Sequence, residues 1–527
     1  MEKTAFKRHL LRKSIVAGIY IIFTVAVCVG VGIANYYLKK FEGSITQTLC
    51  YTEGSKSSAK SASKYGQKLA VEIEQEGIVL AKNNKNDGEE KPVLPLSKDI
   101  DKVNIFGHHI VDWMYSNSGS GSAGPSSGQT WYNLTDALTR YGVEYNTELY
   151  NFYNSWVPTR SLPFSIQASQ SDLYRLAEPS LKNTSGYQAV YDNAKDYSDT
   201  AIVVIGRTGG EHIDTPHHQP NNINASGSGG HANNERGYLV ITEEEEELLK
   251  AVGADFENVI VILNCTNVIE CNFLKDEINF PGLDSVLIVG CTGQYGTFAI
   301  PQIMWGDVNP SGRTADTYPM KHEYNITYFT NGEDFAPYYP DAPSNCNLRN
   351  SRASATKCNF APYIEGIYVG YKWFETADAE HYWTNMGLTY EDVVAFPFGY
   401  GLSYTTFEWE IIDSEPSNYS QIKYEDNMKI NVKVTNTGDV AGRDVVELYL
   451  TAPYYGEIEK SAVKLVGFAK TPNIAPGGSV IVQVECHGYD FASYDCYDDN
   501  ANGHAGYEMD DGEYILRCMT SAHEKSN

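Results

Sequence analysis

The segment that follows one strongly apolar run carries an acid in a position suited to chemistry. Residues 201–206 read AIVVIG and lead directly into Arg207-Thr208-Gly209-Gly210-Glu211-His212-Ile213-Asp214. Glycines before an acid let the backbone turn tightly and direct the side chain into a cleft. A carboxylic acid so placed, here Glu211, can act as a general acid if burial raises its pKa toward the working pH. An ordinary loop with solvated charges is the alternative that spacing alone leaves open.

Two other polar stretches have weaker signals. Four histidines of a Gly/Asn/Ser-rich stretch could hold a metal, but a polar loop is favoured because no i, i+4 pair on a helix supports a site; they are His212, His217, His218 and His231. The run SGSGSAG at 118–124 lacks the Lys-Ser/Thr of a phosphate-binding loop. We therefore predict no metal site and no cofactor.

The elements that must position Glu211 follow from apolar patterning. Short Val- and Ile-rich runs at 103–107, 201–206, 258–264 and 285–290 end at Gly or Asn and are typical of buried parallel strands. Thr242 is expected to cap a helix beginning EEEEELLKAV, whose glutamates we interpret as a solvated first turn. Strands that alternate with helices predict an open, mostly parallel α/β sheet domain over 66–410. Ligands bind such sheets beyond the carboxyl ends of the strands.

The last part of the chain changes its period. Apolar residues alternate with polar ones around 430–434, 446–450, 480–484 and 514–518, with turns at NTGD (436–439) and PGGS (476–479). This pattern predicts an antiparallel, all-β sandwich over 426–520 with one face of each sheet buried.

The N-terminus indicates a membrane protein. Ile15–Ala34 carries no charge and is long enough to span a bilayer, and five Lys and Arg residues precede it. We expect a cytoplasmic basic segment at 1–14, one transmembrane helix at 15–38, a flexible Ser/Lys linker at 39–65 and an extracellular remainder. A cleaved signal peptide is the alternative.

Composition excludes one class of partner. The chain has 527 residues, with 67 acidic against 40 basic residues and a net charge of −27. Nucleic acid is bound through Lys and Arg, so we expect no nucleic-acid partner. Ten cysteines show no metal-ligand spacing. Disulfides and free thiols stay equally open for the pairs Cys265/Cys271, Cys346/Cys358 and Cys486/Cys496.

Together these residues resemble glycoside hydrolase family 3, the family of β-glucosidases, β-xylosidases and related exo-acting enzymes. The resemblance covers about 69–518 and comprises the α/β sandwich domain and the fibronectin type III-like domain. Its motifs occur in family order: GIVLAKN (77–83), GDVNPSGR (306–313), EGIYVGYKWF (365–374), FPFGYGLSYTTF (396–407) and VTNTGDVAGRDVVELYL (434–450). We interpret GDVNPSGR and FPFGYGLSYTTF as segments that hold domains together.

The resemblance implies a retaining mechanism. An Asp nucleophile on a (β/α)8 barrel attacks the anomeric carbon, and a Glu about 5–5.5 Å away protonates the leaving oxygen. By similarity of GRTGGEHID to the family's acid-bearing loop, Glu211 is the acid/base, and Arg207 and Asp214 line the cleft as substrate-binding residues. The loop departs from the family where His212 replaces a Gly and where an insertion, 216–234, follows. Glu235 is the competing acid.

The resemblance lacks one part, because a barrel needs about 200–250 residues and none are available before the α/β domain. Some members carry the barrel last, so we expect a downstream or separate barrel. The first hypothesis is the front half of a membrane-anchored, exo-acting β-glycosidase, a β-glucosidase acting on non-reducing ends of oligosaccharides or other β-glycosides. The second is a non-catalytic cell-surface module that binds glycans or a protein. A retained acid-bearing loop favours the first, and the missing barrel favours the second.

Overall fold

The computed structural model describes residues 27, 53–84, 91–117, 124, 130–156, 174–211, 215–219, 235–328, 338–339, 358–359, 363–415 and 421–524. Residues 1–69 and 70–527 form two separate units, each described by itself. In the first unit, the expected transmembrane segment 15–38 lies outside the described residues except for Val27. Within the described ranges, no helix combines the length and the apolarity needed to cross a bilayer.

Helix α3 (Glu53–Gly77) begins in the first unit and ends in the second. The flexible conformation expected for the linker is not observed at residues 53–65, which are helical. The segment contains Ala, Lys and Ser but no proline, and these residues are compatible with a solvated helix. A Ser/Lys-rich composition therefore did not distinguish a flexible linker from an exposed helix.

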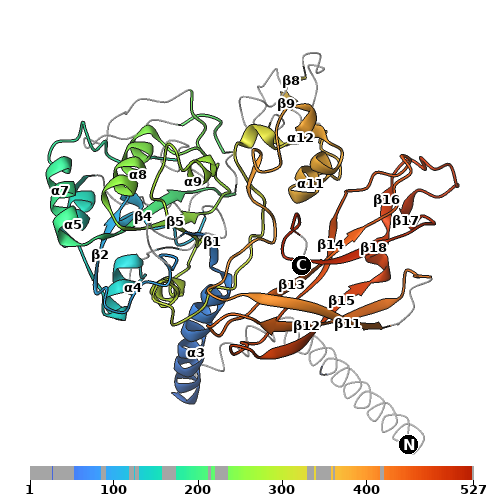
Figure 1. The fold of residues 1–527 in the computed structure, drawn as a ribbon, viewed down its shortest axis with the longest axis horizontal. Coiled ribbons are helices and arrows are strands. Elements are labelled where there is room, and N and C mark those ends of the chain that lie inside the picture. The colour runs from blue at the N-terminus through green and yellow to red at the C-terminus, as the bar shows by residue number, and fades with distance from the viewer. Residues whose placement is uncertain are drawn as a thin grey trace, which may run out of the picture. The chain divides into compact units, whose positions relative to one another are not determined.

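An open six-stranded sheet forms the centre of the α/β domain (Figure 1), in the order β1-β6-β5-β4-β2-β3. Strands β2, β3, β4, β5 and β6 pair in parallel, and β1 joins β6 antiparallel. Their bounds are β1 Val79–Asn83, β2 Lys102–Phe106, β3 Glu144–Tyr145, β4 Thr200–Arg207, β5 Asn258–Cys265 and β6 Ser285–Ile288. The four predicted parallel strands are confirmed, and every residue of β4 is buried.

Helices follow the strands as the alternating pattern predicted. They are α4 Leu134–Tyr141, α5 Thr147–Trp156, α7 Tyr187–Tyr197, α8 Glu243–Asp255, α9 Asn272–Lys275 and α10 Ala299–Met304, with 3-10 turns η1 His108–Ile110 and η2 Gly296–Phe298. Thr242 caps α8 as predicted, because its Oγ1 accepts from the Glu245 N–H and the Glu245 carboxylate accepts from the Thr242 N–H. This reciprocal cap fixes where α8 begins, close to the end of β4.

A connecting segment joins the sheet domain to the second domain. It contains β7 Tyr318–Pro319, paired with β10 Val394–Phe396, and the elements η3 His322–Tyr324, β8 Tyr338–Tyr339, β9 Cys358–Asn359, α11 Tyr371–Ala379 and α12 Tyr382–Asn385. Residues of α11 and α12 form a small core of their own around Phe374 and Trp383.

The second domain is the expected antiparallel β-sandwich. One sheet has the order β11-β12-β15 and the other β14-β13-β18. The bounds are β11 Phe407–Glu415, β12 Asn427–Asn436, β13 Val445–Thr451, β14 Lys464–Lys470, β15 Ser479–His487, β16 Ser493–Asp495, β17 Gly506–Glu508 and β18 Ile515–Met519, with the 3-10 turn η5 Gly488–Phe491. The sandwich starts at β11, which lies before the predicted boundary of 426. The sequence did not reveal this strand because β11 is largely exposed and its residues show no clear alternation of apolar and polar side chains.

The two signature segments, 306–313 and 396–407, lie at the junction of the two domains, as predicted. Arg313 Nη2 donates to Asp444 Oδ1 at 2.6 Å, and the Asn309 Nδ2 group donates to the Ala441 carbonyl at 3.2 Å. The Asn309 Oδ1 atom accepts from the Tyr404 N–H at 2.8 Å. These bonds tie the 306–313 and 396–407 segments to each other and to the fibronectin-like domain, so the interpretation as structural segments is confirmed.

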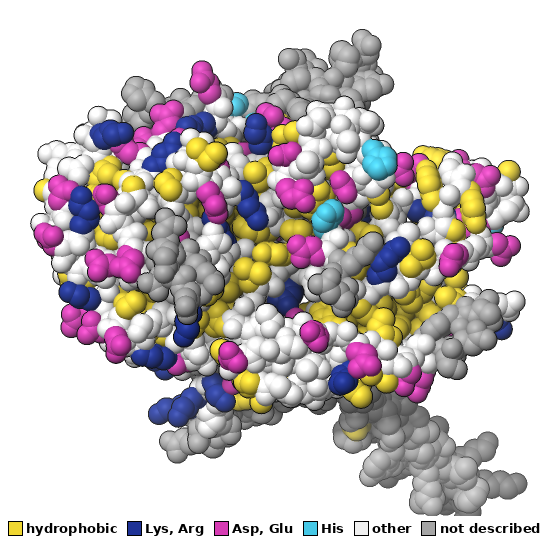
Figure 2. Space-filling model, viewed as in Figure 1, with side chains coloured by type: hydrophobic (Ala, Val, Ile, Leu, Met, Phe, Trp, Pro, Cys, Tyr) yellow, Lys and Arg dark blue, Asp and Glu magenta, His cyan; other side chains and the backbone are white. Residues whose placement is uncertain are grey.

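Among the cysteines whose side chains the structure describes, Cys265, Cys271, Cys291, Cys486 and Cys496 are free thiols. The side chains of the pair Cys346/Cys358 lie outside this part of the chain. Neither Cys265/Cys271 nor Cys486/Cys496 forms the disulfide that the sequence left open. Figure 2 shows acidic side chains spread over this face of the molecule and interspersed with Lys and Arg side chains.

Candidate active site

Glu211 lies where the sequence predicted, on the turn that follows β4 at the carboxyl edge of the sheet, and its side chain is exposed. The backbone leading to it is held from two sides. The Thr208 N–H donates to the Tyr238 hydroxyl at 2.9 Å, and that hydroxyl donates back to the Thr208 carbonyl at 3.2 Å. A Cβ on Gly209 would lie 2.0 Å from Asn267 Oδ1, so a larger residue there would require Asn267 to move. The turn therefore presents Glu211 from a fixed base.

Arg207 anchors this base from inside the domain. Its Nε donates to the Tyr238 carbonyl and its Nη2 to the Val240 carbonyl, each at 2.8 Å. The guanidinium also binds the Glu245 carboxylate with both Nη groups, at 2.8 and 2.6 Å, and Nη1 donates to the Gly206 carbonyl at 2.8 Å. All five N–H donors are thus occupied by protein groups. The predicted contact of Arg207 with substrate stays a prediction, and the geometry gives this side chain a positioning role.

The interpretation of the five glutamates as a solvated first turn is wrong for Glu245. This side chain is buried and completes both the cap of α8 and the pair with Arg207. Burial alone would raise the pKa of Glu245, but the Arg207 guanidinium outweighs burial and lowers it. The spacing Thr242-x-x-Glu245 is a capping box, whereas its pairing with Arg207 needs the tertiary fold.

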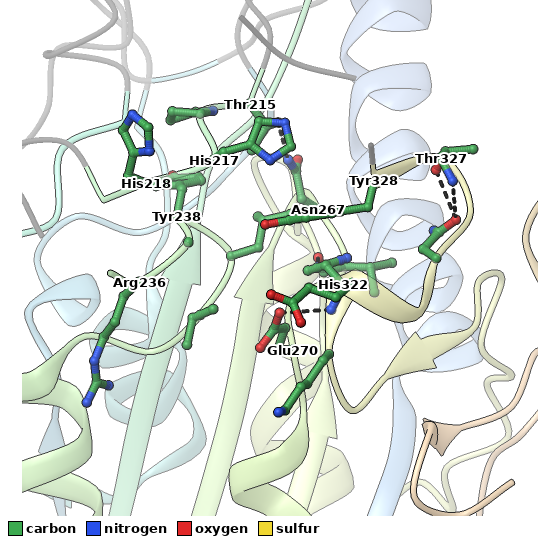
Figure 3. A pocket seen from close by; sticks show the side chains of 18 of the residues that line it. Thr215, His217, His218, Arg236, Tyr238, Asn267, Glu270, His322, Thr327 and Tyr328 are labelled. Atoms are coloured by element: carbon green, nitrogen blue, oxygen red, sulfur yellow. Dashed lines mark hydrogen bonds between the residues drawn. The ribbon is translucent and has the colours of Figure 1, made fainter. Parts of the chain in front are cut away.

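A cavity of about 660 Å3 opens beside this loop at the same edge of the sheet. It is lined by Thr215, Pro216, His217, His218, Glu235, Arg236, Gly237, Tyr238, Leu239, Val240, Asn267, Val268, Glu270, Lys321, His322, Glu323, Asn325, Thr327 and Tyr328. Figure 3 shows His217, Asn267 and Tyr328 close together, with Glu270 and His322 beneath them and Arg236 extending away. The predicted Asp214 and His212 lie outside the described residues, whereas Glu235, the competing acid, lies on the wall of this cavity.

Two titratable groups of the cavity are strongly influenced by burial. Burial lowers the pKa of His322 to about 4, so the ring is neutral near pH 7, and its Nε2 lies 3.0 Å from the Val268 carbonyl. Burial raises the pKa of Glu270, although its Oε1 accepts from the His322 N–H at 2.8 Å. The His217 ring meets the Tyr328 ring edge-on at 4.9 Å between centroids. These groups give the cavity an aromatic and polar lining.

Sequence reasoning missed most of this wall. Asn267 comes just after β5, and a polar residue at the carboxyl end of a buried strand is a signal that could have identified it. His322 and Tyr328 come from a connection without a functional motif, and only the fold brings them to the sheet edge. As for metals, the described ranges contain no group of three or more His, Cys, Asp or Glu side chains that could hold an ion.

A second buried acid lies at the end of β2. Glu178 accepts from the His108 N–H at 2.6 Å and from the Tyr153 hydroxyl at 3.1 Å. Burial raises its pKa to about 8, and the nearby Glu245 carboxylate adds to this effect. Glu178 is enclosed, so it belongs to the support of the site rather than to its surface.

Comparison with protein families gives two matches. A family described as "Glycosyl hydrolase family 3 C-terminal domain" matches residues 78–371. A second family, described as "Fibronectin type III-like domain", matches residues 444–522. The first range covers the six-stranded sheet, the Glu211 turn and the cavity wall, and the second covers most of the β-sandwich.

Curated relatives and solved structures agree with these matches. The chain is 30% identical to β-glucosidase A of Butyrivibrio fibrisolvens over 473 residues, which is 86% of this chain and 50% of the relative. It is 31% identical to a β-glucosidase of Ruminococcus albus, covering 85% of this chain and 38% of the relative. The structure of a β-glucosidase from Paenibacillus barengoltzii superposes with a TM-score of 0.65 at 27% identity, covering 87% of this chain and 42% of that one. The chain thus spans about half or less of the length of these proteins.

Proposed function

Because this chain belongs to glycoside hydrolase family 3, we propose that it supplies the α/β and fibronectin-like domains of an exo-acting enzyme that hydrolyses β-glycosidic bonds at non-reducing ends of oligosaccharides. β-Glucosides are the substrate class that the names of the relatives support. The observation that carries the proposal is the exposed Glu211 carboxylate on a turn fixed at Thr208 and Gly209.

In this proposal Glu211 is the general acid/base. It protonates the leaving oxygen as the glycosidic bond breaks, and then removes a proton from the water that releases the sugar. The nucleophile would be an Asp on a (β/α)8 barrel, contributed downstream or by a separate chain. Among the described residues no sheet closes into a barrel. The role of Arg207 is to hold the base of the acid-bearing turn, and Asp214 is proposed to line the cleft beside Glu211.

The test is Glu211→Gln, introduced at the native locus and assayed in the native protein fraction. A lost proton donor should lower turnover of alkyl glucosides and oligosaccharides by about 10²–10⁴-fold, because their leaving groups need protonation. Aryl glucosides with acidic leaving groups should lose much less in the bond-breaking step. Glu235→Gln is the matched control, and the assignment fails if Glu235→Gln shows the selective loss and Glu211→Gln does not.

A second candidate function, a non-catalytic module that binds glycans or a protein, is favoured by the aromatic and polar cavity of about 660 Å3. It predicts binding of β-linked oligosaccharides or of a protein without hydrolysis by the native fraction. Under this alternative, Tyr328→Ala would weaken binding, while Glu211→Gln would change nothing that can be measured.

We also propose that residues 15–38 form a single membrane anchor with the N-terminus in the cytoplasm and the bulk of the chain outside the cell. The support is the uncharged run Ile15–Ala34 with its preceding basic residues. Alkaline carbonate should leave the chain in the membrane, and protease added to intact cells should remove the part that follows Lys40. Release by carbonate would contradict the anchor.

A further inference from the structure

The side chain of Asn267 contacts the chain on both sides of Glu211. Gly209 comes two residues before Glu211 in the sequence, and Thr215 comes four residues after it. Strands β4 and β5 pair in parallel, and Gly209 and Asn267 each come two residues past the last residue pair of these strands. Asn267 therefore lies at the same sheet edge as the turn, on the wall of the cavity (Figure 3).

The amide group of Asn267 packs directly against the α-carbon of Gly209. A Cβ added to Gly209 would lie 2.0 Å from Oδ1, 2.7 Å from Cγ and 2.7 Å from Nδ2 of Asn267. The whole amide group, and not one atom of it, thus covers this side of Gly209. The backbone can approach the amide this closely because glycine has no side chain. The contact restricts the turn two residues before Glu211.

The same amide group also holds the chain after Glu211. Its Nδ2 donates to Thr215 Oγ1 at 3.2 Å. Its Oδ1 accepts from the Thr266 hydroxyl at 2.9 Å, and this bond fixes the rotation of the amide. The Thr266 N–H in turn donates to the Arg207 carbonyl at 2.9 Å, which ties the backbone beside Asn267 to the end of β4. One oriented side chain therefore joins Gly209 to Thr215, and we call this pair of contacts the Asn267 clasp.

We propose that Asn267 is a positioning residue that holds the Glu211 carboxyl where it can transfer a proton. The inference rests on the general acid/base role proposed for Glu211. Proton transfer needs the two heavy atoms to lie within about 2.6–3.2 Å of each other. A displacement of about 1 Å can lower a rate by about 100-fold. Loss of the clasp should therefore slow the step that depends on the acid, although the Glu211 carboxyl is still present.

The first test is Asn267→Ala, introduced at the native locus and assayed in the native protein fraction. We expect kcat/KM for alkyl glucosides and oligosaccharides to fall about 10–100-fold, because their leaving oxygen needs the proton. For aryl glucosides with acidic leaving groups, kcat/KM should fall less than about threefold. A loss of folded protein would instead lower both values by the same factor.

Asn258→Ala is the matched control. Asn258 stands at the opposite end of β5, and its Nδ2 likewise donates to a threonine hydroxyl, that of Thr200 on β4, at 3.4 Å. This variant should leave the ratio of the two kcat/KM values unchanged, because the bond lies at the edge of the sheet far from Glu211.

A second variant tests the contact with Gly209. Gly209→Ala should displace the Asn267 amide and produce the same selective loss. Asn267→Ala removes the atoms that the new Cβ would meet, so the double variant should lose no more than Asn267→Ala alone.

The outcomes separate this inference from the proposed function. The inference is overturned if Glu211→Gln shows the selective loss and Asn267→Ala does not. It is also overturned if the losses of Gly209→Ala and Asn267→Ala multiply in the double variant. If Glu211→Gln shows no selective loss, the acid/base role of Glu211 fails, and the inference fails with it.

Discussion

Two arginines of this molecule each bind a buried carboxylate with an N–O distance of 2.6 Å, but they use their guanidinium groups differently. Arg207 pairs with Glu245 inside the α/β domain, its side chain is fully buried, and all five N–H donors have partners. Arg313 pairs with Asp444 across the junction to the fibronectin-like domain, and its Nε atom is buried without a partner. The first pair is completely determined by one domain, whereas the second depends on two domains staying together.

The segment that ends in Arg313 and the turn that follows Arg207 differ in what their sequences reveal about the protein. GDVNPSGR, which ends in Arg313, is a motif of the family, yet its Arg313 and Asn309 side chains bind the fibronectin-like domain and take no part in the candidate active site. The turn after Arg207 departs from the family pattern, yet it is the one that presents Glu211. An arginine with all five donors occupied fixes the base of the turn that presents Glu211. The family signature and the candidate active site are therefore physically separate parts of the chain.

The largest effect is expected from breaking the inner pair. Arg207→Met leaves the Glu245 charge buried without its cation and frees three backbone carbonyls from their donor. Because removing one partner of a buried pair costs about 3–5 kcal/mol, we expect a loss of this size in the unfolding free energy of Arg207→Met. Urea denaturation measures it. Arg236→Met is the control, because Arg236 and Glu246 are each 27% exposed and their pair should contribute less than about 1 kcal/mol. Equal losses in the two variants would mean that the Arg207 pair is not special.

A smaller effect of a different kind is expected at the outer pair. Asp444→Asn removes the charge that binds Arg313, while the amide oxygen can still accept from the Trp409 Nε1–H, now at 2.7 Å from the carboxylate. We expect a loss of about 2–3 kcal/mol and, because the pair joins two domains, a calorimetric transition that separates into two. A single transition, shifted as a whole, would show that other contacts suffice to couple the domains.

Much of the fold could be predicted because its signal is local. The Val- and Ile-rich runs at β2, β4, β5 and β6 can be recognised as strands without knowledge of the strands they pair with. The spacing Thr242-x-x-Glu245 likewise predicts the start of a helix from local sequence alone. The Arg207–Glu245 pair joins residues that are 38 positions apart in the sequence. The local sequence around either residue gives no sign that it will pair with the other. The cavity wall at His322 and Tyr328 was missed for the same reason. Glu211, which is adjacent to its own strand, and Glu235, which lies just before the capped helix, could be proposed from sequence.

The smallest expected effect concerns a second buried carboxyl that lies near each arginine pair. Beside Glu245, burial raises the pKa of Glu178 to about 8, and beside Asp444, burial raises the pKa of Glu447 to about 8. An acid whose pKa is higher in the folded state than its ordinary value of 4.5 binds more protons when folded, so stability falls as pH rises from about 4.5 to 8. His322, whose pKa burial lowers to about 4, has the opposite slope between about 4 and 6.5.

Below pH 6.5 the carboxyls and His322 change the unfolding free energy in opposite directions. The effect of the carboxyls is therefore best measured between pH 6.5 and 8, where His322 contributes little. We expect the unfolding free energy of the wild-type chain to fall over this range, and Glu178→Gln to remove about 1 kcal/mol of that fall, since the amide keeps an acceptor for His108 and cannot ionise. Glu415→Gln, at an exposed strand end, should leave the slope unchanged. An unchanged slope in Glu178→Gln would mean that Glu178 is already ionised in the fold.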